Sequence, residues 1–106
     1  MRNVRITVIK KGFDAELVAE HMKPTAAKTF RPCAHGIGES FLVGQPVMCP
    51  EGLCPWAWHD IESFVRIAGF GGAADDDRPE GCWIRSCADA FRPVTFLIEP
   101  LDEASA

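Results

Sequence analysis

Apolar side chains alternate with polar ones near both ends of this chain, and that pattern constrains the fold most. Residues 4–8 follow a period of two, and residues 94–98 repeat it between two prolines. This period predicts strands that bury one face and expose the other. Shorter strands are expected over residues 39–43 and 82–87. The chain therefore predicts a sheet of about four strands.

The middle of the chain has the period of a helix instead. Residues 57–68 gather apolar side chains on one face, at Ala57, Ile61, Phe64, Val65 and Ala68. A shorter helix is expected from Asp14, which can cap it, to about Met22, and Pro24 should stop it. His21 falls on the apolar face of that helix, so we expect it in or near the core.

The order of these elements predicts one α+β domain over residues 1–101, with two helices packed on a mostly antiparallel sheet. Residues 102–106 are expected to form a disordered tail. Residues 25–38 and 45–55 have little periodicity and are expected to be long loops, and both carry cysteines. The segment 73–81 is expected to be an acidic, solvent-exposed loop.

Composition and charge narrow the class of protein. With 106 residues and 47% apolar residues, the chain can form one core without metal or disulfide staples. The net charge is −4 and the basic residues are scattered, which argues against nucleic acid as a partner. No apolar run approaches the roughly 20 residues that span a bilayer. The start resembles no signal peptide, so we expect a soluble protein of the reducing cytoplasm.

Five cysteines are the main sign of chemistry, namely Cys33, Cys49, Cys54, Cys82 and Cys87. An odd number cannot pair completely within one molecule, so at least one thiol stays free. In a reducing compartment, such a set more often binds metal or takes part in catalysis than forms disulfides. The alternative is that all five are buried thiols without chemistry.

Cys54 has the most suggestive setting. Pro55 suits the first position of a helix, which makes Cys54 the N-cap. A thiol there faces the positive end of the helix dipole, which favours the thiolate. His59 could act as its base, or it could simply be solvated. The alternative for Cys54 is packing as a small apolar residue beside tryptophan.

A metal site can be assembled from residues in several segments. Cys33, Cys54 and Cys87 together with His35 supply the four ligands of a zinc site. Three cysteines alone would leave an open position, either for a zinc-bound water or for an iron of an iron–sulfur cluster.

Two further groups of residues allow either a structural or a functional role. Asp89 and Arg92 are expected to pair and hold the turn after Cys87, although they could instead orient a ligand. The three tryptophans, Trp56, Trp58 and Trp83, could line a pocket or an oligomer contact, but large aromatic residues more often build the core.

The chain resembles a family of small, uncharacterised prokaryotic proteins. The resemblance rests on residues 4–9, on the Cys-Pro-Trp-Ala-Trp motif of residues 54–58, and on Cys-Ala-Asp with Arg-Pro-Val over residues 87–94. It implies a single domain, occasionally repeated in tandem, whose recurring cysteines correspond to Cys33, Cys54 and Cys87. This chain has Ala90 where the family usually has Gly. The resemblance implies no particular reaction.

Three functions remain open from the sequence. The first is a small protein that binds zinc or an iron–sulfur cluster through Cys33, Cys54 and Cys87, with His35 as a further ligand. The second is a thiol-dependent enzyme or redox protein with Cys54 as the reactive thiolate. The third is a non-catalytic interaction module that forms a homo-oligomer through exposed apolar surface.

Overall fold

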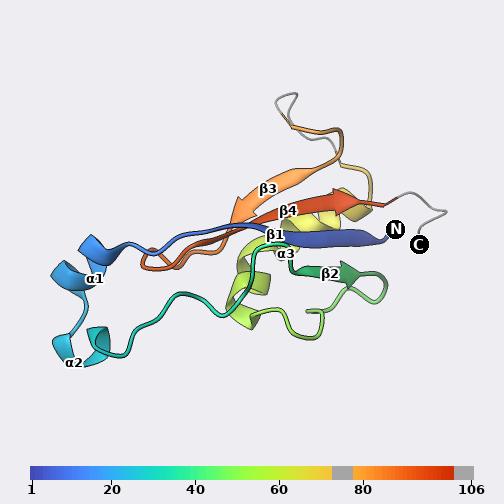
Figure 1. Ribbon diagram of the computed structural model, residues 1–106. Helices are drawn as coiled ribbons and strands as arrows, with labels where there is room; N and C mark the ends of the chain where they lie inside the picture. Colours follow the sequence, from blue (N-terminus) through green and yellow to red (C-terminus); the bar gives the residue numbers. More distant parts are fainter. Residues whose placement is uncertain (73–77, 102–106) are drawn as a thin grey trace.

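The structure, a computed structural model, describes residues 1–72 and 78–101. The expected tail and residues 73–77 of the expected acidic loop lie outside the described residues. In chain order (Figure 1), the elements are β1 (Val4–Lys11), α1 (Ala15–His21), α2 (Pro24–Ala27), β2 (Ser40–Val43), α3 (Pro55–Gly69), β3 (Trp83–Ser86) and β4 (Val94–Pro100).

The four strands form one antiparallel sheet in the order β2-β1-β4-β3. The two strands with the clearest alternation, β1 and β4, are neighbours in its centre, with Ile6 opposite Ile98. A register shift between Val8 and Lys10 marks a bulge in β1, which the alternation of residues 4–8 does not reveal. The predicted α+β class and the antiparallel sheet are confirmed.

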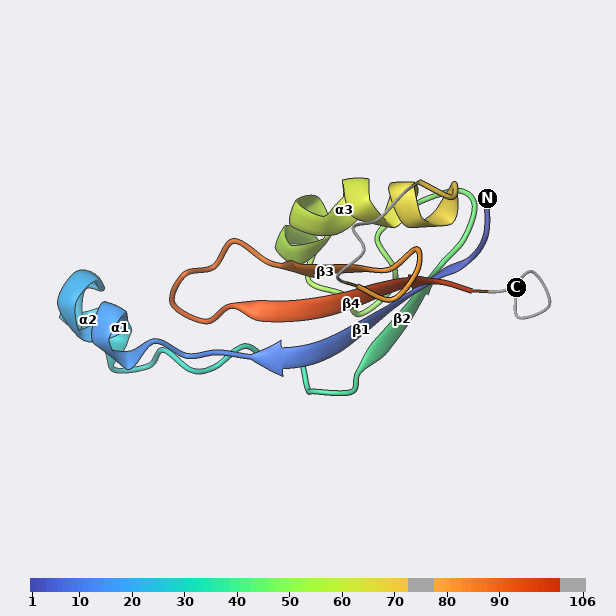
Figure 2. The same ribbon diagram turned by 90° about the horizontal axis from the view of Figure 1, so that it is seen from above.

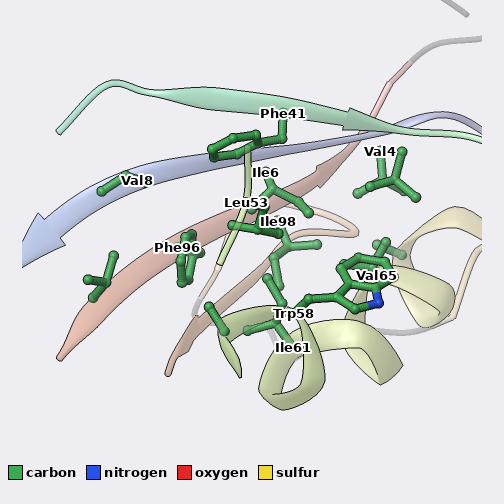
Figure 3. Close-up of a cluster of buried hydrophobic side chains, with 14 residues drawn as sticks. Val4, Ile6, Val8, Phe41, Leu53, Trp58, Ile61, Val65, Phe96 and Ile98 are labelled. Atoms are coloured by element: carbon green, nitrogen blue, oxygen red, sulfur yellow. The ribbon is translucent and has the colours of Figure 1, made fainter. Parts of the chain in front are cut away.

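The core lies between α3 and one face of the sheet (Figures 2 and 3). Alternate residues of β1 and β4 are fully buried there against the apolar face of α3. Burying a large aliphatic or aromatic side chain contributes about 1.5–3 kcal/mol. The largest fully buried side chains are Phe96, Ile6, Ile61, Ile98, Val4, Val8, Val65 and Val94. No helix in the described part of the chain is long and apolar enough to cross a bilayer.

The helices α1 and α2 lie beyond the end of β1, apart from the sheet (Figures 1 and 2). Of the two predicted helices, therefore, only the second packs on the sheet. Asp14 does cap α1, because its carboxylate accepts a hydrogen bond from the Leu17 N–H at 3.0 Å. His21 is exposed, not part of the core, because α1 has no sheet beneath it. The helix α2 was not predicted, since four residues are too few to reveal a period.

Candidate thiol site

A cavity of about 580 Å³ lies where three segments meet: the chain before β2, the start of α3 and the loop between β3 and β4. The cavity brings together all four residues of the predicted metal set, although they are far apart in sequence. Its lining residues are Cys33, His35, Cys54, Trp56, Ala57, His59, Asp60, Cys87, Ala88, Asp89, Arg92 and Val94. A second cavity of about 440 Å³ shares Cys33, His35, Cys54 and Arg92 with it.

Cys54 is the N-cap of α3, as the sequence predicts. Pro55 occupies the first turn, and the Cys54 carbonyl accepts the first helical hydrogen bond from the Trp58 N–H at 3.0 Å. The preceding turn contains Gly52 at φ +89°, a conformation that suits glycine. Within the described residues, the Cys54 thiol makes no hydrogen bond and no disulfide. The thiol therefore lines the cavity without a hydrogen-bond or disulfide partner among these residues.

His35 holds the backbone of Cys54. The Cys54 N–H donates to His35 Nε2 at 3.0 Å, so that nitrogen carries no proton. The other ring nitrogen, Nδ1, bonds Glu39 Oε1 at 2.5 Å and is the donor in that pair. The ring is buried, with 8% of its surface exposed. In this arrangement both ring nitrogens already have partners, and the ring positions the start of α3.

Cys87 lies at the start of a tightly bonded loop. Its Sγ accepts a hydrogen bond from the Val94 N–H at 3.3 Å, and its own N–H donates to the Val94 carbonyl at 3.0 Å. The carboxylate of Asp60, from α3, accepts the Ala88 N–H at 2.8 Å. These bonds fix Cys87 relative to α3.

Asp89 and Arg92 pair, as the sequence predicts, and Arg92 also reaches the segment that carries Cys33. Arg92 Nε donates to Asp89 Oδ2 at 3.2 Å, and Asp89 Oδ1 accepts two backbone N–H groups of the same loop. Arg92 Nη1 donates to the Arg31 carbonyl at 3.0 Å, and the guanidinium stacks over Phe30. Arg92 therefore ties the Cys33 segment to the Cys87 loop.

Cys49 and Cys82 do not line the cavity. Burial raises the pKa of Cys49, and the nearby Cys54 raises it further. Burial also raises the pKa of Cys82, with a smaller contribution from Glu99. The two thiols therefore stay protonated at neutral pH and provide an internal comparison for the three in the cavity.

The described residues contain no group of three or more His, Cys, Asp and Glu side chains arranged to hold a metal ion. The predicted metal set thus shares one cavity without forming a prebuilt coordination site. A metal would have to draw the thiols together, and His35 could join only by releasing the Cys54 N–H.

Sequence reasoning did not single out Asp60, which anchors the Cys87 loop. Helical spacing could have found it, because Trp56, His59 and Asp60 are three and four residues apart and share one face of α3. Ala90 does not adopt the positive φ that a glycine there would allow, since no non-glycine residue in the described chain does so.

Comparison of the chain with models of known protein families, with curated proteins and with solved structures finds no match in any of the three. The resemblance noted from the sequence stays a prediction.

Proposed function

We propose that this protein is a thiol-dependent enzyme that acts on a small molecule, with Cys54 as its nucleophile. One observation carries the proposal: three unpaired thiols, Cys33, Cys54 and Cys87, come from distant segments and line one cavity. Most of the polar side chains around them are occupied in holding backbone. The three thiols and His59 are the reactive groups that remain.

The setting of Cys54 suits a nucleophile. The first N–H groups of a helix have no partners within the helix, and the dipole adds to their attraction for negative charge. His59 is exposed on the next turn of α3 and lines the same cavity, and no side chain in the described residues engages it. In the proposed chemistry His59 accepts the Cys54 proton, and the thiolate attacks the bound molecule.

The size of the cavity favours a small molecule over a bare ion. Ligand cavities usually measure about 300–1,000 Å³, and this cavity falls within that range. Its walls combine apolar side chains with a few polar groups, as ligand sites usually do.

Capture of a soft metal is the second candidate, because three thiolates are a donor set that zinc or an iron–sulfur cluster prefers. Cys33, Cys54 and Cys87 would hold the metal, and His35 is the candidate fourth ligand. When bound, zinc would supply a Lewis acid and a cluster would supply electron transfer.

Labelling kinetics test the first candidate. Native, reduced protein is treated with iodoacetamide at neutral pH, and mass spectrometry follows each cysteine. Cys54 is expected to react at least about tenfold faster than Cys49 or Cys82, because those two thiols stay protonated. The variant His59→Gln should slow the labelling of Cys54, whereas Cys82→Ser, which alters a thiol outside the cavity, should leave that labelling rate unchanged. Equal, slow rates at all five cysteines would overturn the proposal.

Elemental analysis separates the two candidates. Metal bound in equimolar amount, and lost in both Cys54→Ser and Cys87→Ser, would favour metal capture. Metal-free protein in which Cys54 is labelled fast would favour the proposal that Cys54 is a nucleophile.

A further inference from the structure

Among the residues that the structure describes, Trp56 is the most exposed large apolar one, with 82% of its surface accessible. The other two tryptophans have structural partners: Trp58 is buried in the core, and Trp83 packs on Phe64 at 5.1 Å. The ring of Trp56 has no aromatic, cation–π or hydrogen-bond partner within the described residues. The fold therefore gives no structural reason for a tryptophan at this position.

Trp56 lines the same cavity as the three thiols. It lies on the first turn of α3, two residues after Cys54. The apolar wall beside it consists of small side chains, Ala57, Ala88 and Val94, which leave room for a flat molecule.

The charges around the cavity argue against an anionic ligand. Arg92 is the one Arg or Lys among the lining residues, and its guanidinium is paired with Asp89 and stacked on Phe30. Asp60 already accepts a backbone N–H. The surface left for a ligand is aromatic, apolar and rich in sulfur.

From these observations, and resting on the proposed function, we infer that the cavity binds a flat, uncharged, unsaturated molecule. The ring system of the ligand stacks on Trp56 while an electron-poor alkene carbon meets Cys54. The sulfur forms a bond to that carbon, the π bond opens, and its electron pair moves to the neighbouring carbon. That carbon takes up the proton released by the thiol, so the step is an addition without an oxidant or reductant.

Two maleimides with the same reactive group test the inference. The rate of Cys54 labelling is measured with N-phenylmaleimide and with N-methylmaleimide, and their ratio is divided by the same ratio for free N-acetylcysteine. Stacking on Trp56 should raise this normalised ratio about two- to tenfold. Trp56→Ala should return the normalised ratio to one, and Trp56→Phe should keep most of the increase. Phe70→Ala, which removes an exposed aromatic residue at the other end of α3, should change neither rate.

The outcomes separate the two levels of the proposal. If the normalised ratio is one while Cys54 is still labelled fast, the inference of an aromatic ligand is overturned, but the proposal that Cys54 is a nucleophile is not. A Trp56→Ala variant that slows both reagents equally also overturns the inference, because Trp56 would then act on the thiol. Slow labelling of Cys54 by both reagents overturns the proposed function itself.

Discussion

At the scale of residues, the polar groups around the cavity mostly serve the backbone. His35 accepts the N–H of Cys54, Asp60 accepts the N–H of Ala88, and Asp89 closes the loop after Cys87. Each bond satisfies a donor that would otherwise lack a partner, and each fixes a segment that carries a thiol. The segments that carry the three thiols are therefore held in place by polar side chains that bond backbone groups.

The substitution His35→Ala should lower the free energy of unfolding by about 1–3 kcal/mol, because it removes the acceptor for the Cys54 N–H and empties a buried position. Urea denaturation measures the change. His21→Ala is the matched control, since that histidine is exposed, and its effect should stay within about 0.5 kcal/mol. Equal effects of the two substitutions would contradict the positioning role of His35.

The cysteines of the cavity could be predicted from sequence, but the role of His35 could not. Cys54 is visible because Pro55 marks the start of a helix. His35 was predicted as a metal ligand from its nearness to Cys33, whereas its hydrogen bond to Cys54 spans 19 residues. A contact of that kind depends on how two loops close on one another, which no local pattern encodes.

At the scale of elements, the start of α3 decides where Cys54 lies. The turn before it brings the Leu53 N–H to the Pro50 carbonyl at 3.2 Å, and Gly52 adopts a positive φ within that turn. A residue with a side chain is strained at such an angle, even where space is available.

Gly52→Ala should therefore destabilise the protein by about 1–3 kcal/mol and slow the labelling of Cys54. The comparison is Gly36→Ala, where a new Cβ meets nothing within 4 Å and φ is not positive. Thermal or urea unfolding of both variants provides the measurement. If Gly52→Ala is as stable as Gly36→Ala, the turn does not need glycine.

Elements whose apolar pattern repeats over many residues were predicted well. The alternation in β1 and β4 and the apolar face of α3 persist over enough residues to identify each element and its buried side. The bulge in β1 and the four residues of α2 have no such repeat. The position of α1 away from the sheet also escaped prediction, because its apolar residues do not reveal what they pack against.

At the scale of the whole molecule, stability is unevenly distributed. The chain extends over 50 × 30 × 20 Å, and α1 and α2 occupy one end of it with Val18 as their one buried residue. The sheet and α3 hold the core at the other end (Figure 2).

Native-state hydrogen exchange should reveal two levels of protection. Amides of β1, β4 and α3 should exchange slowest, and those of α1 and α2 should be at least about tenfold less protected, because few apolar contacts oppose their opening. Uniform protection across all these elements would mean that α1 and α2 are stabilised by more than their few apolar contacts.

The central place of β4 has a consequence for synthesis. β4 emerges from the ribosome after the other three strands, yet it must insert between β1 and β3, and its first residue bonds the sulfur of Cys87. Until then, a growing chain carries ordinary cysteines at unrelated places. The three thiols come to line one cavity only when the sheet closes, so a chain that lacks β4 lacks the complete wall of that cavity.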